Sequence, residues 1–411
     1  MCAGYLSPEN HPARMIADLR RRFNDNFSQE KYDRMIDWLA EQYDYRPTFH
    51  VAETPVFVPS AVRDRLLAAC KDVMDVVTQP DFTERSGPAI PPGENVPGQT
   101  ERPLFLQLDF ALCTDEEGRV LPQLIECQGF PSLYFFQHLL DVSFRRFYDI
   151  PDNLTCRFGG YDSQQYLELL RRTIVADHDP EEVILLEVDP VKQNTRIDFL
   201  VCCRELGIAE VCISDVELED GKLYYHKEGR RIRVRRIFNR VIFDELNLRP
   251  ELKRTFSMVE EADVEWAGHP NWFFLLSKFT LPLIDSPYVP DTRFLHEIAE
   301  LPDDLDNYVL KPLYSFAGAG VDLHPTPEKL AAIAKPHHFI LQRKVEYARL
   351  VETLDEPARA EVRMMFLWPE DEPRPLLVNN LVRLSKGEMI GVKYNMGKTW
   401  VGGSLGYFPT T

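Results

Sequence analysis

The clearest pattern of apolar and polar positions in the chain lies between residues 104 and 133. Two apolar runs, Leu104–Cys113 and Val120–Cys127, flank an acidic segment, Asp115–Gly118, that ends in glycine. Two short strand-like runs separated by a polar segment with glycine are typical of a β-hairpin. The sequence therefore predicts a hairpin centred on that segment.

Four polar side chains should share one face of this hairpin, because successive side chains of a strand point to opposite faces. They are Gln107, Asp109, Glu126 and Gln128. Carboxylate and amide oxygens held on rigid strands suit a hard cation such as Mg²⁺, which keeps several waters and also binds phosphate. A half-buried hairpin with a solvated polar face is the alternative interpretation.

Helical patterns surround the hairpin. Apolar positions at helical spacing predict two amphipathic helices within residues 13–45 and a third over 61–77. Glycine and proline residues predict a long loop over 83–102. A further helix is expected over 134–147, directly after the hairpin.

Strand and helix patterns alternate in the middle of the chain. A helix is predicted over 166–175, a buried strand over 183–188 and a helix over 196–206. Further strands are predicted over 209–213, 222–225 and 231–238. Strand–helix–strand order implies a parallel, Rossmann-like sheet.

The one dense basic cluster of the sequence falls in this region, at residues 230–236. Its alternation fits one charged, solvated face of a strand. An anionic substrate near Arg236 or Arg240 is the alternative hypothesis.

A lysine and a loop of small residues follow later in the chain. The sequence predicts a helix over 273–283 that contains Lys278, and a strand that ends at Lys311. Gly318 and Gly320 come next, in a loop whose backbone N–H groups can approach phosphate oxygens. Lys311 would supply a point charge to the same phosphate.

The remaining strands carry more cations. Apolar runs predict strands over 338–345, 360–368 and 378–386. Five cations then lie at strand ends or on helices beside one sheet: Lys278, Lys311, Arg363, Arg383 and Lys386. Cations in such a place can neutralise triphosphate and acyl-phosphate charge. Surface ion pairs are the alternative explanation for each of them.

Composition narrows the function classes. The 411 residues are enough for two or three domains. A net charge of −18 and a pI near 5.1 argue against nucleic-acid and anionic-membrane partners. No apolar run approaches the roughly 20 residues that span a bilayer, and the N-terminus has no secretory pattern. The 8 cysteines form no C-x-x-C pair, so we expect free thiols and a cytoplasmic protein.

With these motifs in place, the chain resembles the circularly permuted ATP-grasp ligases, namely the eukaryotic-type glutathione synthases and the glutathionylspermidine synthases. The resemblance covers about residues 100–410 and lies in the joint order of the motifs. It implies an α/β fold, a circularly permuted ATP-grasp body interrupted by a Rossmann-like substrate domain and preceded by helices.

The resemblance also implies a division of the chain. An N-terminal helical region would cover residues 1–100, and the first part of the ATP-grasp body would cover 101–175. The Rossmann-like substrate domain would follow over 176–265, and the nucleotide-binding lobes over 266–411.

Site roles follow from the same resemblance. Asp109 and the run Glu126–Gln128 match the family's metal-binding aspartate and its E-x-N motif. Lys278 and Lys311 match the two ATP lysines, and the second of them heads the glycine-rich loop. Arg383 matches an arginine that contacts the accepting substrate, and we assign Arg363 to catalysis with it.

The run ILQRKV resembles the family's adenine hinge. This assigns Gln342, Lys344 and Val345 to the nucleotide, with Glu346 or Glu361 as the ribose contact. Lys386 is assigned to the nucleotide as well, and the run at 391–403 resembles a late mobile loop.

Four residues, in three motifs, depart from the family pattern. Gln128 stands where the family has Asn, and Gln107 stands where it has an arginine that positions the acyl phosphate. Phe316 and Ala317 stand where it has Arg and a metal-binding Glu.

The sequence thus predicts an ATP-dependent carboxylate–amine ligase that uses Mg²⁺ and forms an amide through an acyl phosphate. Its substrates would be a small-molecule or peptide carboxylate and an amine, and a homodimer is the assembly considered. A nucleotide-binding protein without turnover is the first alternative, motivated by Gln107 and Ala317. A small-molecule kinase is the second.

Overall fold

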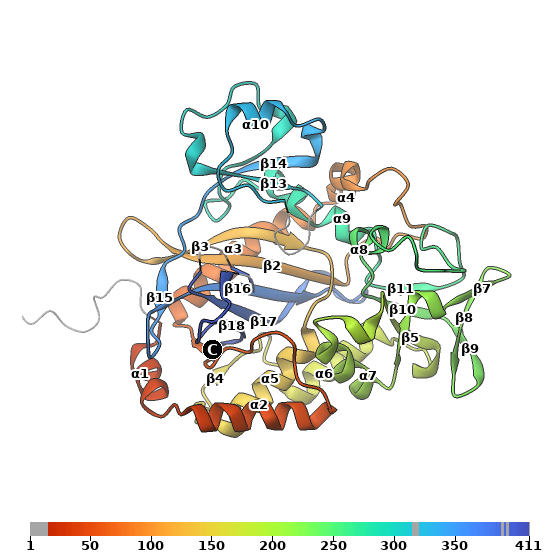
Figure 1. Ribbon diagram of the computed structural model, residues 1–411, viewed down its shortest axis with the longest axis horizontal. Coiled ribbons are helices and arrows are strands. Elements are labelled where there is room, and N and C mark those ends of the chain that lie inside the picture. The colour runs from red at the N-terminus through yellow and green to blue at the C-terminus, as the bar shows by residue number, and fades with distance from the viewer. Residues whose placement is uncertain (1–14, 315–319, 388–389, 392–393, 411) are drawn as a thin grey trace, which may run out of the picture.

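A six-stranded sheet forms the centre of the molecule (Figure 1). The structure is a computed structural model that describes residues 15–314, 320–387, 390–391 and 394–410. Strand order in the large sheet is β18-β17-β16-β2-β3, with β15 pairing with β16. The strands are β2 (Phe105–Thr114), β3 (Val120–Gln128), β15 (Arg349–Val351), β16 (Ala358–Leu367), β17 (Leu376–Ser385) and β18 (Gly402–Ser404). Segments about 250 residues apart in sequence therefore share one sheet.

The predicted hairpin is confirmed as β2 and β3, which pair antiparallel. The amide of Gly118 donates to the carbonyl of Asp115, and Gly118 has φ 75°, which glycine adopts without steric cost. Asp109 lies opposite Glu126 in this register. The four polar side chains therefore share one face of the hairpin, as their spacing predicts.

The two faces of β2 differ in what covers them. Leu106, Leu108 and Phe110 alternate along one face and pack in a core with α3 (Ser60–Val77). The opposite face begins with Phe105, which packs in a second core with α5 (Tyr134–Phe147), and continues with the polar residues of the hairpin. One face is thus apolar throughout, and the other is polar only at Gln107 and Asp109.

The helices expected in the first half of the chain are present. They are α1 (Ala17–Asp25), α2 (Gln29–Tyr43), α3, α5 and α6 (Ser163–Ile174). In Figure 1, α2 and α5 lie below the large sheet. A small sheet of order β1-β19-β4 joins both ends of the described chain, through β1 (Val56–Phe57), β4 (Leu154–Thr155) and β19 (Gly406–Pro409).

A second lobe holds a four-stranded sheet of order β11-β10-β5-β6, in which every neighbouring pair is parallel. Its elements are β5 (Val183–Glu187), α7 (Arg196–Leu206), β6 (Ala209–Cys212), β10 (Arg236–Asn239), α8 (Phe243–Asn247) and β11 (Glu265–Ala267). The prediction of a parallel sheet in this region is confirmed.

One strand predicted for that parallel sheet, and part of another, lie elsewhere. The segment 231–238 is not one strand but two, and only β10 joins the parallel sheet. Residues 230–234 form β9, which pairs antiparallel with β8 (Lys222–Lys227) in a sheet completed by β7 (Glu217–Glu219). The two residues between β8 and β9, Glu228 and Gly229, both have positive φ, as a tight hairpin turn requires. Sequence alternation continues across both strands and therefore hides the break at residue 235.

A third lobe stands above the large sheet in Figure 1 and consists of residues 292–314 and 320–343. Its antiparallel sheet has the order β12-β14-β13, with β12 (Thr292–Phe294), β13 (Tyr308–Pro312) and β14 (Phe339–Arg343). The helix α10 (Pro327–Ala331) covers it through Leu330, in a core with Leu310 and Leu341. We call this part the small lobe.

Two other predictions need correction. The helix expected over 273–283 is broken: α9 (Trp272–Leu275) ends, Ser277 is extended, and a 3₁₀ turn begins at Lys278. The hydroxyl of Ser277 accepts from the amide of Phe279, and this cap starts the new turn. The loop expected over 83–102 begins within a short helix, α4 (Phe82–Ser86).

Within the described residues, no helix is long and apolar enough to cross a membrane. The seven cysteines of the described chain are all free.

Candidate functional site

Charged side chains from four neighbouring strands meet on the polar half of the large sheet. The register places Arg363 of β16 directly opposite Asp109 of β2, and Glu361 directly opposite Arg383 of β17. Together with the hairpin residues they make up the charged face, which we define as Gln107, Asp109, Glu126, Gln128, Glu361, Arg363 and Arg383. Backbone pairing alone thus brings residues 107 and 383 into one site.

Asp109 is the centre of the charged face and is 1% exposed. Nε and Nη2 of Arg363 donate to its two oxygens at 2.6 and 2.7 Å, and Nη2 of Arg383 adds a bond of 2.5 Å. Burial opposes ionisation of this carboxyl, but the charges of both arginines outweigh it and hold the pKa of Asp109 below its usual range. Asp109 is therefore ionised, and both of its oxygens accept hydrogen bonds from arginines.

Glu126 is held by the first predicted lysine. Nζ of Lys278 lies 2.8 Å from Oε1 of Glu126, and Nε2 of Gln128 donates to Oε2 at 3.2 Å. Burial alone would raise the pKa of Glu126, but Lys278 lowers it below its usual value. The 3₁₀ turn that carries Lys278 thus completes the site beside β3.

Lys311 links the small lobe to the hairpin. It stands on β13, and its Nζ donates to the carbonyl of Ile125 at 3.3 Å and to Oε1 of Gln342. Burial, assisted by the charge of Lys278, lowers the pKa of Lys311 to about 8. The charge of Glu126 acts on Lys311, so the lysine of the small lobe lies near the carboxylate of the hairpin.

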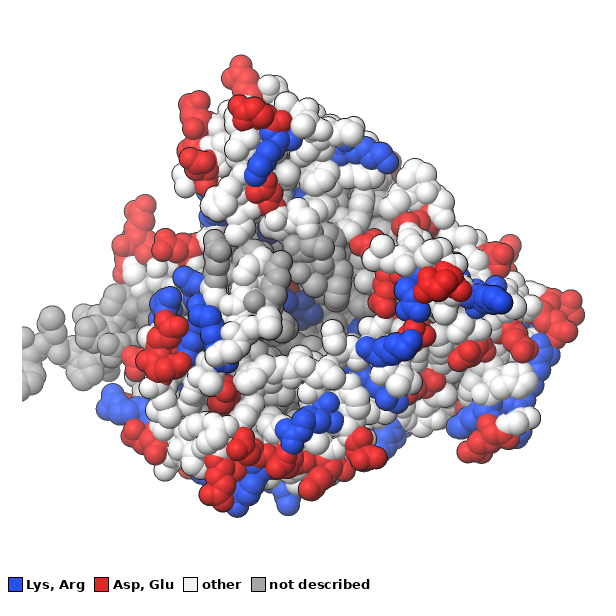
Figure 2. Space-filling model, viewed as in Figure 1, with Lys and Arg blue, Asp and Glu red and all other residues white. Residues whose placement is uncertain are grey.

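The surface is hollowed between the small lobe and the part of the molecule below it, as Figure 2 shows. Lys or Arg atoms are visible inside this hollow. The charged face, Lys278 and Lys311 lie where the two parts meet. A polyanion entering between them would therefore meet cations on both sides.

Sequence reasoning did not find Tyr347. Its hydroxyl donates to Oε2 of Glu361 at 2.6 Å, while Arg383 binds Oε1. Both oxygens of Glu361 are thus occupied, whereas Glu346 is exposed. Of the two glutamates considered for a ribose contact, Glu346 is the accessible one. A lone tyrosine in a linker carries no pattern that a sequence could reveal.

The residues assigned to an adenine hinge have other contacts. The side chain of Gln342 binds Lys311 and the hydroxyl of Thr292. The amide of Lys344 donates to the carbonyl of Asn307 at 2.7 Å. Val345 is half-buried in the linker that follows. Gly320 has φ 72°, and Gly318, Phe316 and Ala317 lie outside the described residues.

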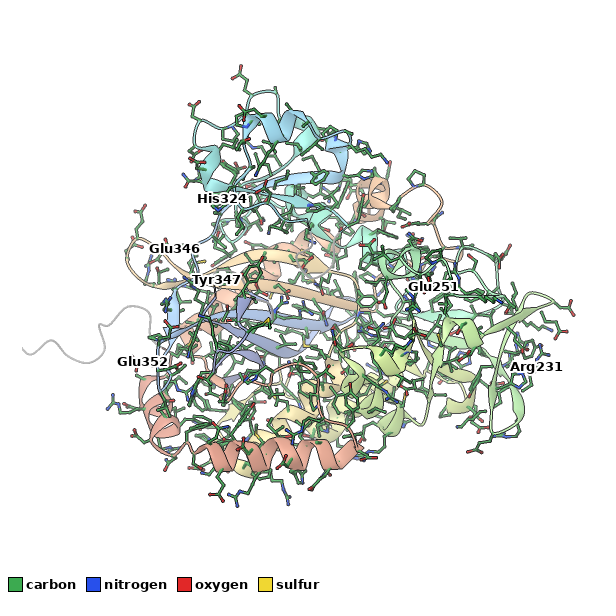
Figure 3. The ribbon with its side chains drawn as sticks, in the orientation of Figure 1. Arg231, Glu251, His324, Glu346, Tyr347 and Glu352 are labelled. Atoms are coloured by element: carbon green, nitrogen blue, oxygen red, sulfur yellow. The ribbon has the colours of Figure 1, made fainter. Side chains whose placement is uncertain are left out.

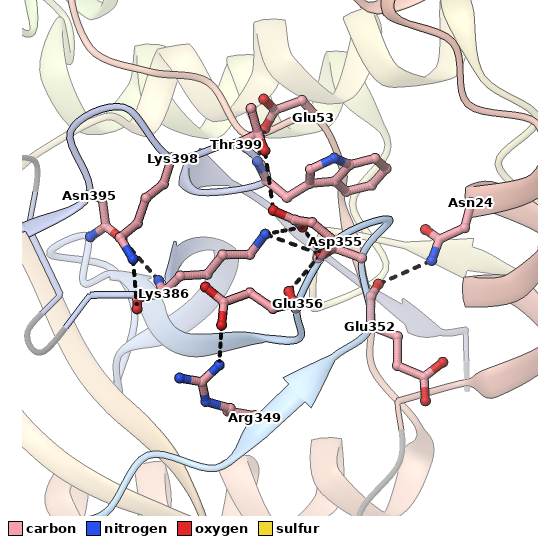
Figure 4. A network of polar contacts seen from close by, with 12 residues as sticks. Asn24, Glu53, Arg349, Glu352, Asp355, Glu356, Lys386, Asn395, Lys398 and Thr399 are labelled. Atoms are coloured by element: carbon pink, nitrogen blue, oxygen red, sulfur yellow. Dashed lines mark hydrogen bonds and ion pairs between the residues drawn. The ribbon is translucent and has the colours of Figure 1, made fainter.

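Lys386 lies apart from the charged face. Its Nζ binds Asp355 and the hydroxyl of Thr353, and its side chain is 1% exposed (Figure 4). Thr399 also contacts Asp355, and Nζ of Lys398 donates to the carbonyl of Lys386 at 3.3 Å. This lysine therefore connects two loops instead of joining the other predicted cations.

The oxygens present fit Mg²⁺ in part. In the described chain no three His, Cys, Asp or Glu residues are grouped so that they alone could hold a metal. Mg²⁺ at nucleotide sites commonly binds one or two carboxylates and completes its shell with water and phosphate. Glu126 and Gln128 meet that smaller requirement, whereas both oxygens of Asp109 face arginines.

Arg240 is a buried cation at the end of β10. It is 5% exposed, its guanidinium stacks on Phe130 and Phe199, and Nε and Nη1 have no hydrogen-bond partner among the described residues. Burial lowers the pKa of Arg240 and raises the pKa of nearby Glu187 to about 8. The chain runs from β5 to β6 on one side and returns to β10 on the other, so Arg240 lies at the switch point of the sheet.

The neighbouring basic cluster has a different character. Arg236 binds Glu265 and the carbonyls of Ile174 and Thr173. Arg230, Arg231, Arg233 and Arg235 all pair with acidic residues at the surface. Figure 2 shows red and blue intermingled on this lobe. The cluster is therefore neutralised locally, and only Arg240 fits the hypothesis of an anionic substrate.

Comparisons with known proteins agree with this architecture. No family model matches the chain, and no curated protein matches its sequence. Its structure is similar to that of a glutathione synthetase-like effector from Globodera pallida in its apo form, with a TM-score of 0.56. The match covers 93% of this chain and 96% of the other at 11% identity. The fold expected from the order of the motifs is thus confirmed as that of the glutathione synthetase-like proteins.

Proposed function

We propose that the protein is an ATP-dependent carboxylate–amine ligase of the circularly permuted ATP-grasp type. In this reaction ATP phosphorylates a carboxylate, and an amine attacks the acyl phosphate and displaces phosphate to form an amide. The small lobe and the charged face would be the two sides of the nucleotide site. The four-stranded parallel sheet would belong to an inserted substrate domain.

One observation carries the proposal. Lys278, Lys311, Arg363 and Arg383 gather where the small lobe meets the charged face. They come from four separate elements and are all at least half-buried. Burying four cations is costly unless anions compensate them. The carboxylates Asp109, Glu126 and Glu361 pair with Lys278, Arg363 and Arg383. Lys311 instead donates to two neutral oxygens, so an anionic ligand would compensate its charge.

The residues have separable roles in this proposal. Lys311 and Lys278 bind phosphate oxygens from opposite sides of the hollow. Arg363 and Arg383 offset the charge that develops on the transferred phosphoryl group and on the acyl phosphate. The reaction needs positioning and charge neutralisation and no protein nucleophile. Gln342, Lys344 and Val345 would border the base, and Glu346 would face the ribose.

Mg²⁺, when bound by Glu126 and Gln128, would neutralise the phosphates and polarise the transferred group. Lys278 competes for the same carboxylate oxygen of Glu126. Nucleotide binding would therefore draw Lys278 from Glu126 to phosphate as the metal arrives.

A second carboxylate of the substrate, besides the one that reacts, has a candidate partner in Arg240. A guanidinium with two unpartnered, desolvated nitrogens gains more from an anion than an exposed one does. Phe130, over which Arg240 stacks, lies two residues after Gln128, so this subsite adjoins the charged face. The proposed substrate accordingly carries a second anionic group besides the carboxyl that reacts.

Calorimetry with Mg²⁺·ATP tests the first step, and ADP release across pairs of carboxylic acids and amines tests the second. We expect micromolar-to-millimolar nucleotide affinity and release that requires both substrates. No nucleotide binding would refute the proposal. Stable phosphorylation of one compound without an amine would identify a kinase instead.

A second function has its own support. The ion pairs that occupy both oxygens of Asp109 favour a nucleotide-binding protein without turnover. Tight nucleotide binding without ADP release in the same experiment would identify it.

A further inference from the structure

The linker between the small lobe and the large sheet is fixed at both ends. The amide of Lys344 donates to Asn307 in the small lobe, and its Nζ donates to Asp306 there at 2.6 Å. At the other end the amide of Ala348 donates to the carbonyl of Leu112 on β2 at 2.9 Å. A change in the angle between the two parts must therefore be absorbed by residues 345–347.

Tyr347 is the last residue of this short hinge, and Figure 3 shows it between the small lobe and the large sheet. Its hydroxyl donates to Glu361 at 2.6 Å. Burial and the charge of Glu361 raise the pKa of Tyr347 well above its usual value, so the phenol stays protonated and remains a donor. The hinge is thereby hydrogen-bonded to the charged face itself.

Glu361 also pairs with an arginine. It is 3% exposed, and the oxygen that Tyr347 does not bind is paired with Arg383. The side chain of Arg383 is 39% exposed and reaches Asp109 with the same nitrogen, Nη2. A long side chain that is partly exposed loses its fixed geometry when one of two carboxylate partners moves.

We propose that Tyr347 is a positioning residue that couples the hinge to Arg383 through Glu361. When the small lobe moves, the linker turns, Tyr347 shifts on Glu361, and Arg383 changes its aim toward the transferred group. The role rests on the proposed function for its catalytic consequence, but the three-residue coupling does not need it. Tyr347 itself touches no reacting atom.

The variant Tyr347→Phe removes the hydroxyl and keeps the ring. Tyr308→Phe is the matched control, because Tyr308 also donates its hydroxyl to a carboxylate, that of Asp291 at 3.0 Å, but neither residue belongs to the charged face. We expect Tyr347→Phe to lower kcat about tenfold, as the loss of one hydrogen bond to a charged group implies, with KM for ATP within about twofold. In an Arg383→Met background the same change should lower kcat less than twofold. An equal loss in both backgrounds, or an equal loss in the Tyr308→Phe control, would overturn the role.

A second measurement decides the coupling without turnover. Equilibrium unfolding in urea of the wild type, Tyr347→Phe, Arg383→Met and the double variant gives a double-mutant cycle. We expect the effects on the unfolding constant to depart from multiplicativity by more than about threefold, since both residues share Glu361. The cycle of Tyr308→Phe with Arg383→Met should be multiplicative. If both cycles are multiplicative, Tyr347 does not act on Arg383. If the first is coupled and no acid–amine pair yields ADP, the proposed ligase fails and the coupling stands.

Discussion

Arg363 binds both carboxylate oxygens of Asp109 from the neighbouring strand. The two residues lie directly opposite each other in the antiparallel pairing of β2 and β16, so backbone register sets the bidentate geometry. Gln107, two residues earlier on the same face, accepts a third bond from Nη1 of Arg363 at 2.9 Å. An arginine on β16 thus stands beside Gln107.

The variant Asp109→Asn should be strongly destabilised. It leaves Arg363 and the partly exposed Arg383 close together without their shared carboxylate, and removing one member of a buried pair costs about 3–5 kcal/mol. Urea unfolding measures the loss. The matched control is Asp75→Asn, whose partner Arg374 is 55% exposed, and we expect a change within about 1 kcal/mol there. Equal losses in the two variants would mean that Asp109 does not hold the charged face together.

The variant Lys311→Met should be more stable than the wild type but bind nucleotide less tightly. Lys311 has an ordinary pKa of 10.5 in the unfolded chain and about 8 in the folded protein, so the folded state disfavours its charge. We expect the variant to gain about 1–3 kcal/mol of stability at pH 7 and to lose nucleotide affinity. Calorimetry and urea unfolding on the same preparations test both effects.

The pH dependence of that stability difference follows from the same pKa. Between pH 8 and 10.5 the unfolded wild type binds more protons at residue 311 than the folded protein does, so wild-type stability rises with pH across this window. The excess stability of Lys311→Met over the wild type should therefore decrease from pH 8 to 10.5. Lys329→Met, which removes an exposed lysine of the small lobe, is the control for the loss of a lysine in this lobe. A constant advantage would contradict the burial of charge at Lys311.

Local patterns were enough to predict much of the large sheet. The hairpin and its polar face follow from period-two alternation and one glycine, and Asp109 and Glu126 share a face as expected. The helix at 134–147 has the predicted bounds. These features depend on neighbouring residues, which is why a single sequence reveals them.

The features that the sequence did not predict depend on contacts between residues far apart in the chain. The split between β9 and β10 depends on which sheet each joins, because residues 230–234 pair with β8 and residues 236–239 pair with β5. The contacts of Lys386 with Asp355 and of Tyr347 with Glu361 bring together loops that carry no periodic signal. Two guanidinium nitrogens of Arg240 lack hydrogen-bond partners among the described residues because of how the lobe packs, and the sequence alone does not distinguish Arg240 from Arg236.

Asp355→Asn tests whether Lys386 serves the nucleotide. In the structure Lys386 is held by Asp355, as Figure 4 shows, so it can reach a phosphate only by leaving that carboxylate. If the assignment of Lys386 is right, removing the competing charge should raise nucleotide affinity severalfold in calorimetry. Glu356→Gln is the control, since Glu356 is similarly exposed on the same loop and binds Arg349 instead. Unchanged affinity in Asp355→Asn would make Lys386 a structural residue of the two loops.

Substitution by methionine should lower the free energy of unfolding at Arg236 and leave it unchanged or raise it at Arg240. Arg236→Met leaves two backbone carbonyls and Glu265 without their donor, and we expect a loss of about 2–4 kcal/mol in urea unfolding. Arg240→Met removes a guanidinium with two desolvated, unpartnered nitrogens, and we expect no loss or a gain. Destabilisation of both variants to the same extent would show that Arg240 has a structural partner.

The same pair of variants tests the carboxylate subsite without turnover. Small dicarboxylates that bind the wild type should raise its Tm in proportion to the logarithm of their concentration above Kd. Arg240→Met should lose this rise, because the buried donors that bind the anion are gone. Nucleotide affinity should stay within about twofold in Arg240→Met, because Arg240 is not among the cations that the proposal assigns to the nucleotide. A rise in Tm that persists in Arg240→Met would place the carboxylate elsewhere, with Arg383 as the next residue to change.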